Sequence, residues 1–367
     1  MKEQTLKKIY VLIQVSFSLI FLSLIILSKG TTDAGDGITH YLISKGALNH
    51  PELFFDHWGK PLFTMFSSGF SYFGYKGICV FNGLCIIATS IIAELVVIKH
   101  TNKNGFPFAF ILTLFCPVLF ACGFAGLTEP LFALILCLGI FLLYTERYIS
   151  GSLLLSFIPF VRTEGFLLIP IFFLFTILQK KWKSGLWLTA GTIMMSLGGS
   201  WVYNTIFWIL EKNPYKGAKA LYGSGPLMHF VVNSETIFGW AFTIIVFSGI
   251  SIILFRTLKN KAPENQKLIL LCILTFFTYY IAHSIFWWKG LVGSLGLFRV
   301  MAAIVPAGSI IGAVGIHQIL AEKDKKIYLS GPIILLLVWH IYHPFKLYKP
   351  PIKPDGEQAL FLRISRD

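Results

Sequence analysis

Residues 78–98 read ICVFNGLCIIATSIIAELVVI, and this run indicates what kind of protein the sequence encodes. Glu94 is its only charged side chain, and Lys99 and His100 follow it directly. An α-helix needs about 20 apolar residues to cross the hydrocarbon core of a bilayer. A run of this length and polarity therefore predicts a membrane-spanning helix.

The rest of the chain repeats this pattern. Its 367 residues are 55% hydrophobic and only 13% charged, and the mean hydropathy is +0.72. A soluble domain of this length would be far less apolar. We predict an all-α integral membrane protein with about eleven transmembrane helices. We expect one membrane domain over residues 1–345 and a short outer tail over residues 346–367.

The basic residues are distributed as topology determinants. The formal net charge is +14, and the 31 Lys and Arg residues form short clusters between apolar runs instead of one basic face. This pattern predicts a multi-pass protein of the inner (plasma) membrane, with its N-terminus in the cytoplasm and its C-terminus outside. Membrane lipids are expected neighbours, and no nucleic acid is expected as a partner.

Some segments depart from simple spanning runs. Residues 106–122 and 186–210 each predict one outward span. Residues 152–178 instead hold two half-length apolar pieces separated by VRTEG at 161–165. We expect a broken or re-entrant pair there, because irregular backbone at membrane depth is tolerated where it lines a cavity. Residues 62–75, rich in Phe, Ser and Gly, predict short interfacial helices in the first outer loop.

Acidic residues are scarce, and two groups of them lie in the first outer loop. The groups consist of Asp33 and Asp36 with His40, and of Glu52 and Asp56 with His57 and Lys60. A carboxylate at the mouth of a membrane cavity can act as a general base on a hydroxyl or help to hold a divalent cation. The alternative is an ordinary solvated loop in which Asp and Gly form turns.

Further ionisable residues lie near breaks in the apolar runs. Glu129 precedes Pro130 at the start of a helical run, and Arg162 and Glu164 flank the break in residues 152–178. Ionisable groups at such depth suggest function, but Arg162 and Glu164 can also simply pair or cap helix ends. Arg299 follows a glycine-rich turn, where it can bind a phosphate or serve as an interfacial snorkelling arginine.

Taken in order, these segments resemble the GT-C superfamily, the multispanning glycosyltransferases that use polyprenyl-phosphate donors at the outer membrane face. GDGITHY at 35–41 resembles the acidic motif of their first outer loop, with Gly37 where they usually have a second acidic residue. FFDHWGKP at 54–61 is similar to the D-H-P-P segment of protein O-mannosyltransferases and aminoarabinose transferases. TEP at 128–130 with VRTEG at 161–165 resembles the mannosyltransferase-like signatures, and GLFRVMAAIVP at 296–306 resembles the late arginine motif.

The resemblance implies an inverting transfer of a hexose or mannose-like sugar from a polyprenyl-phosphate donor to an acceptor hydroxyl. Asp36 is the implied base, with Asp33 as the second candidate, and Arg299 with Arg162 would bind the donor phosphate. The implied substrate-binding residues are Asp56, His57, Lys60, His40, Glu129 and Glu164. Some relatives use a divalent metal such as Mg²⁺ or Mn²⁺ and others do not, so the metal requirement stays open. The short outer tail favours a small or lipid-linked acceptor over a folded protein.

Two other classes of function are compatible with ten or eleven helices and basic residues in a cavity. One is a lipid-linked saccharide flippase or secondary transporter, and the other is a non-catalytic assembly subunit. Neither needs an acidic cluster in the first outer loop. Replacement of Asp36 therefore discriminates an enzyme, which would lose sugar transfer, from either alternative.

Overall fold

A computed structural model describes residues 2–102, 105–212, 222–260, 263–321 and 323–347. Within these ranges the chain is helical and contains no strand. The prediction of an all-α fold is confirmed. The prediction for the outer tail falls almost entirely outside the described residues.

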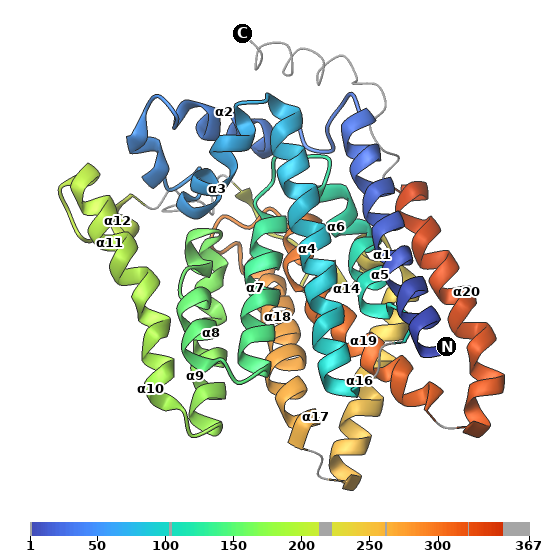
Figure 1. The fold of residues 1–367 in the computed structure, drawn as a ribbon. Helices are drawn as coiled ribbons and strands as arrows, with labels where there is room; N and C mark the ends of the chain where they lie inside the picture. The colour runs from blue at the N-terminus through green and yellow to red at the C-terminus, as the bar shows by residue number, and fades with distance from the viewer. Residues whose placement is uncertain (1, 103–104, 213–221, 261–262, 322, 348–367) are drawn as a thin grey trace.

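Long apolar helices form the body of the protein (Figure 1). By length and composition, five helical segments in the described part of the chain can each cross a membrane. They are Lys8–Leu27 in α1 (Lys2–Leu27), Tyr75–Thr101 (α4), Trp240–Lys259 in α16 (Trp240–Asn260), Glu264–Lys289 and Phe298–Leu320. The fourth combines α17 (Pro263–Leu268), a π-helical turn η5 (Ile269–Ile273) and α18 (Leu274–Lys289), and the fifth combines η6 (Phe298–Ile304) and α19 (Val305–Leu320). The predicted count of eleven spans stays a prediction.

Helix α19 lies at the centre of the bundle, whereas α1 lies at its edge. The apolar window of the segment that contains α19 is 94% buried, and that of α1 is only 11% buried. Small residues allow α16 to approach α19 closely, because a Cβ on Gly315 would lie only 2.5 Å from the Cα of Gly249. Small-residue contacts of this kind are the usual way in which membrane helices pack. Helix α20 (Lys323–Leu347) packs beside both.

The predicted outward run over residues 106–122 is not one continuous helix, and its passage across the membrane stays a prediction. The structure has two short helices there, α5 (Phe108–Leu114) and α6 (Pro117–Cys122), separated by an extended Cys116. Pro117 starts the second helix because proline lacks the N–H that a continuous helix would need. The buried Glu94 carboxylate accepts hydrogen bonds from the backbone N–H groups of Ala109 (2.8 Å) and Phe110 (3.2 Å), at the start of α5. Glu94 therefore stabilises a helix end.

The predicted broken pair over residues 152–178 is confirmed. Helix α7 (Glu129–Tyr144) leads into α8 (Tyr148–Leu155), and the 3-10 turns η2 (Ile158–Phe160) and η3 (Thr163–Leu167) precede α9 (Ile169–Leu178). The next predicted span, 186–210, is shorter in the structure. It comprises α10 (Trp182–Gly185), η4 (Leu186–Thr189) and α11 (Ala190–Tyr203), which ends at a left-handed Asn204.

Short helices cover one end of the bundle, at the top of Figure 1. They are α2 (Asp36–Gly46), η1 (Pro51–Phe55) and α3 (Pro61–Ser71), so the prediction of short helices in the loop after α1 is confirmed. The side of the membrane on which this loop lies stays a prediction. Tyr72 and Phe73 follow α3 and are each 76% exposed, as expected for aromatic side chains at a membrane interface. The short helices α12 (Trp208–Glu211), α14 (His229–Val232) and α15 (Ser234–Phe238) follow later in the chain.

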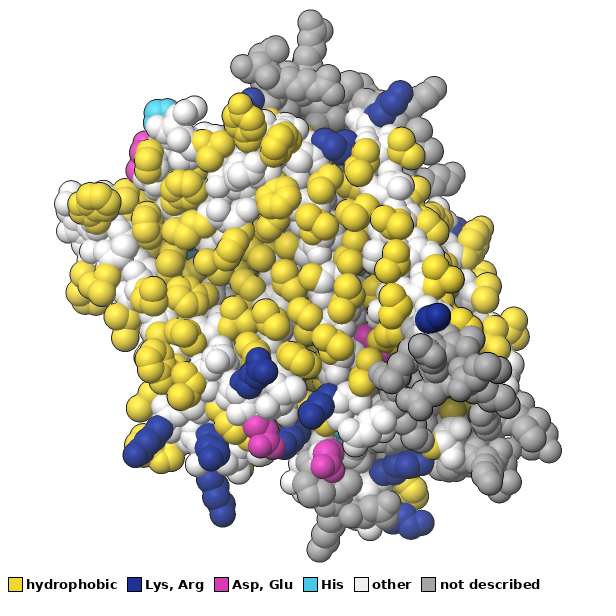
Figure 2. Space-filling model, viewed as in Figure 1, with side chains coloured by type: hydrophobic (Ala, Val, Ile, Leu, Met, Phe, Trp, Pro, Cys, Tyr) yellow, Lys and Arg dark blue, Asp and Glu magenta, His cyan; other side chains and the backbone are white. Residues whose placement is uncertain are grey.

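The surface has the polarity of a membrane protein. Figure 2 shows a broad hydrophobic face, with Lys and Arg side chains concentrated toward its lower and upper margins. At the end opposite α2, a hollow is lined by Arg147 and three lysines, Lys180, Lys181 and Lys183. The chain is thus an integral membrane protein, and its orientation in the membrane stays a prediction.

Candidate active site

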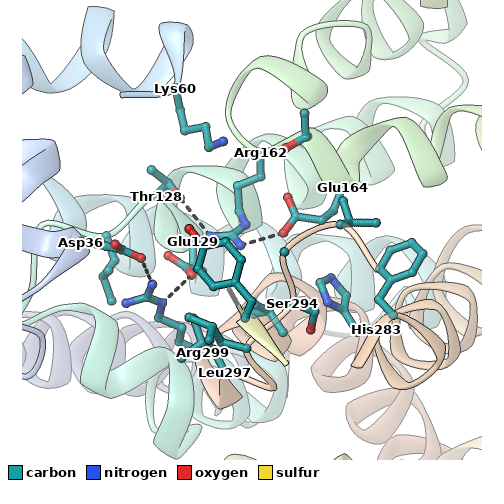
Figure 3. A pocket seen from close by; sticks show the side chains of 18 of the residues that line it. Asp36, Lys60, Thr128, Glu129, Arg162, Glu164, His283, Ser294, Leu297 and Arg299 are labelled. Atoms are coloured by element: carbon teal, nitrogen blue, oxygen red, sulfur yellow. Dashed lines mark hydrogen bonds and ion pairs between the residues drawn. The ribbon is translucent and has the colours of Figure 1, made fainter. Parts of the chain in front are cut away.

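A polar cavity of about 350 Å³ lies beneath the short helices of the first outer loop (Figure 3). Its walls come from segments far apart in the chain. Seven of the residues singled out in the sequence line it: Asp36, His40, Lys60, Glu129, Arg162, Glu164 and Arg299. The fold therefore brings together groups that the sequence places in four separate regions.

Arg299 joins the late arginine motif to the first outer loop. Its Nη1 donates to Asp33 Oδ2 and its Nη2 donates to Asp36 Oδ2. Arg299 lies on η6, and Asp36 is the first residue of α2. The pairing with two carboxylates fixes the guanidinium group at the wall of the cavity.

The two aspartates have different surroundings. The Oδ1 of Asp33 also accepts hydrogen bonds from the backbone N–H groups of Gly35 (3.1 Å) and Gly37 (3.0 Å), so Asp33 caps the start of α2. Asp36 lines the cavity and its side chain is 37% exposed, against 20% for Asp33. Of the two, Asp36 is the carboxylate that a molecule in the cavity can reach.

A second arginine lies beside the first. Arg162 donates from Nη1 to Glu129 Oε1 (2.6 Å) and to Thr128 Oγ1 (3.1 Å), and from Nη2 to Glu164 Oε1 (2.8 Å). The predicted pairing of Arg162 with Glu164 is present, and Glu129 is an additional partner. Glu129 Oε1 also lies 3.4 Å from Arg299 Nε. The fully buried Glu129 thus connects the two guanidinium groups in one network.

Close packing holds the first outer loop against the start of α7. Gly37 contacts Gly126, where a Cβ would lie 2.3 Å from the Gly37 carbonyl oxygen. The buried Tyr75 hydroxyl bonds Thr31 Oγ1 (2.7 Å) and accepts from the Gly126 N–H (3.1 Å). The absence of a second acidic side chain at position 37 has a physical reason, since a Cβ there would lie 3.0 Å from the Tyr75 hydroxyl and 3.2 Å from the Gly126 nitrogen.

Lys60 and His40 extend into the cavity from the outer helices. Lys60 precedes α3 with a φ of +62°, a strained conformation for a residue with a side chain. Burial lowers the pKa of Lys60 to about 8. Burial, together with the nearby charge of Lys60, lowers the pKa of His40 well below its usual 6.5, so His40 is neutral. Its Nδ1 is buried without a hydrogen-bond partner.

Asp56 and His57 lie outside the residues that line this cavity. Asp56 Oδ1 accepts a hydrogen bond of 2.6 Å from the Gly59 N–H and so closes the turn that leads to Lys60. The His57 ring packs against Trp208, with the ring centroids 6.3 Å apart, and burial lowers its pKa. The structure places both residues where they support the loop.

The far wall of the cavity comes from residues outside the predicted catalytic and binding set. His283 on α18 lines it, and its Nε2 is buried without a partner. Residues 292–295 and Leu297 form the adjoining wall (Figure 3), where Val292 has a φ of +58°, an outlier for a β-branched residue. The glycine-rich turn in the sequence indicated a loop at these residues. That this loop lines the cavity is a consequence of how the helices pack.

The carboxylates of the cavity do not form a metal site. Within the described ranges, no three His, Cys, Asp or Glu side chains are grouped so that they could hold a metal ion. The oxygens of Asp33, Asp36 and Glu129 that face one another are bound by guanidinium groups. The donor set therefore does not fit a divalent cation.

Comparison with known proteins finds likeness in structure only. No protein-family model matches the chain, and no curated protein sequence matches it. The structure of ArnT from Cupriavidus metallidurans bound to undecaprenyl phosphate matches with a TM-score of 0.61 and 9% identity, over 97% of this chain and 75% of ArnT. The oligosaccharyltransferase of Archaeoglobus fulgidus in complex with zinc and sulfate matches with a TM-score of 0.59 and 14% identity, over 93% of this chain and 53% of the oligosaccharyltransferase.

The chain thus spans about half of the archaeal enzyme and three quarters of ArnT. At this level of identity the likeness concerns the fold, and it agrees with the order of motifs in the sequence. This integral membrane protein has the fold of the GT-C glycosyltransferases.

Proposed function

We propose that this protein transfers a glycosyl group from a polyprenyl-phosphate donor to an acceptor hydroxyl. The observation that carries the proposal is the carboxylate of Asp36, which faces the cavity while its partner Arg299 fixes its position. Supporting it, ArnT, which has the same fold, binds undecaprenyl phosphate. The donor sugar is proposed to be a hexose or a mannose-like sugar.

The proposed reaction is a single displacement with inversion. Asp36 accepts the proton of the acceptor hydroxyl while the oxygen attacks the anomeric carbon. The bond between that carbon and the phosphate oxygen breaks, and the lipid phosphate leaves with the bonding electrons. Arg299 and Arg162 lie at the cavity wall, where their positive charges can stabilise the charge that develops on the phosphate. Phosphate is a good leaving group, so this mechanism requires no acid.

The size and position of the cavity support a small reacting centre. Ligand pockets start at about 300 Å³, and a cavity of about 350 Å³ is large enough for one sugar unit with its phosphate. The polyprenyl chain would then lie outside it, along the apolar surface of the bundle. A small or lipid-linked acceptor, reached from the outer face of the membrane, fits this arrangement.

The test is transfer of radiolabelled sugar from mannosyl- and glucosyl-phosphate polyprenols by the purified protein in lipid nanodiscs. We expect Asp36→Asn to lower the transfer rate by at least about 100-fold, the usual minimum for loss of a general base, while donor binding is retained. Glu52→Gln is the matched control, because Glu52 is an exposed carboxylate of the same loop.

The outcomes separate the proposed enzyme from its rivals. Full transfer by Asp36→Asn would exclude Asp36 as the base. Donor binding without transfer by the wild type, together with translocation of the labelled lipid that Asp36→Asn leaves unchanged, would identify a flippase.

A further inference from the structure

The position of Arg299 among three carboxylates has a consequence for metal use. Its guanidinium group donates to Asp33 and Asp36, and its Nε lies 3.4 Å from Glu129. We propose that this site works without a divalent cation, because the guanidinium group of Arg299 lies where such a cation would have to bind. The inference deepens the proposed function and rests on it for its meaning in catalysis.

Most carboxylate oxygens around Arg299 already accept hydrogen bonds. A magnesium ion requires near-octahedral oxygen ligands at about 2.0–2.1 Å. Both oxygens of Asp33 are already acceptors, one from Arg299 and one from the cap of α2. Glu129 Oε1 accepts from Arg162, and Asp36 Oδ2 accepts from Arg299. These bonds occupy four of the six oxygens of the three carboxylates, so a metal ion would have to displace some of them before it gained a full set of ligands.

The positive charge of Arg299 also repels a cation. An arginine side chain stays protonated at all physiological pH values. The Arg299 guanidinium therefore cannot lose its charge to admit a cation, and the Arg162 guanidinium bound to the same Glu129 oxygen adds a second positive charge. The Arg299 side chain is only 16% exposed, so water screens this repulsion weakly.

The guanidinium group of Arg299 occupies the space between three carboxylates. Without its side chain, Asp33, Asp36 and Glu129 would present carboxylate oxygens to one vacated space. One of these oxygens, Glu129 Oε2, is already buried without a hydrogen-bond partner. Carboxylate oxygens are the ligands that Mg²⁺ and Mn²⁺ prefer. No three such side chains among the described residues are grouped for a metal ion as the structure stands. Removal of the guanidinium group should therefore let these carboxylates move together around one ion.

The experiment measures Mn²⁺ binding by electron paramagnetic resonance, with the purified protein in nanodiscs after treatment with EDTA. We expect no stoichiometric Mn²⁺ in the wild type. We expect one Mn²⁺ per chain in Arg299→Met, with a dissociation constant at least about 100-fold lower than that of the wild type. Adding Asp36→Asn to Arg299→Met should abolish the new site. Arg256→Met is the control, because Arg256 lies far from the cavity and donates to the Gln318 carbonyl.

Two results would overturn the proposal. One is a stoichiometric Mn²⁺ site in the wild type that Asp36→Asn removes. The other is a folded Arg299→Met protein that binds no Mn²⁺, because the carboxylates would then not be a latent metal site. If Arg299→Met fails to fold, Mn²⁺ binding is measured on the wild type and on Arg299→Lys instead. The lysine keeps the positive charge, so neither protein is expected to bind Mn²⁺.

Failure of this inference is distinguishable from failure of the proposed function, since Mn²⁺ binding requires no turnover. Where the transfer assay succeeds, excess EDTA should change the rate by less than about twofold. Where no transfer is found, the Mn²⁺ results still decide whether Arg299 takes the place of a cation.

Discussion

Replacing Glu129 by glutamine should destabilise the protein strongly, although the change removes only a charge. Glu129 is fully buried, and its Oε1 lies 2.6 Å from Arg162 Nη1 and 3.4 Å from Arg299 Nε. Its carboxylate therefore compensates two guanidinium groups that are themselves mostly buried. Glutamine keeps the shape and one acceptor oxygen but leaves both positive charges with less compensation.

The magnitude follows from the distances. Charges about 4 Å apart interact with about 4 kcal/mol at an effective dielectric constant of about 20, so two arginines give about 8 kcal/mol in gross terms. The amide recovers part of this through neutral hydrogen bonds, and burial of a carboxylate is itself costly. Loss of one partner of a buried ion pair typically destabilises a protein by about 3–5 kcal/mol, which we take as the net effect.

The assay is thermal unfolding in detergent, followed by tryptophan fluorescence. At about 2–4 °C per kcal/mol for a larger domain, we expect the apparent Tm of Glu129→Gln to fall by about 10 °C. The exposed Glu52→Gln variant serves as the control and should change the Tm by about 1 °C or less. A Glu129→Gln protein as stable as this control would refute the conclusion that Glu129 compensates two arginines.

Three further changes test the surroundings of the cavity. Because burial lowers the pKa of Lys60 to about 8, the unfolded chain binds more protons than the folded one between pH 8 and the usual value of 10.5. The apparent Tm of the wild type should therefore rise from pH 7 to pH 9 relative to that of Lys60→Met, and parallel profiles would contradict the shift. Gly126→Ala should cost about 1–3 kcal/mol in unfolding free energy, because its Cβ would lie 2.3 Å from the Gly37 carbonyl oxygen. Gly69→Ala, with nothing within 4 Å of the added Cβ, is its control in the same unfolding measurement. Tyr75→Phe should cost about 1–2 kcal/mol, because it leaves a buried N–H without its acceptor, and an unchanged Tm would count against this bond.

Much of the fold could be predicted from the sequence, because the thickness of a bilayer fixes the length of a span. The run over residues 78–98 lies within α4, and the VRTEG break separates two half-length helices. The break at Pro117 was missed, since hydropathy stays high through it and a proline at the start of a helix leaves the composition of the run unchanged. The hydropathy of a segment indicates whether lipid or water surrounds it. It does not respond to a local break in the helix such as the one at Pro117.

The candidate site could be predicted in its parts but not in its connections. Asp36 and Arg299 each stood out as ionisable groups near an apolar run, and the pairing of Arg162 with Glu164 followed from their adjacency. That Glu129 connects both arginines depends on how α7, η3 and η6 pack, which a single sequence does not encode in any local pattern. His283 lies on an apolar helix, and only the packing decides which face of that helix meets the cavity.

The contact between Arg299 and Asp36 joins residues 263 positions apart, and this separation has a consequence for biosynthesis. At about 5–20 residues per second, a ribosome needs about 13–50 s to reach the arginine after it has made the aspartate. The early helices must therefore enter the membrane with the acidic residues of the first outer loop still uncompensated by Arg299. A chain stalled before residue 299 would keep them uncompensated.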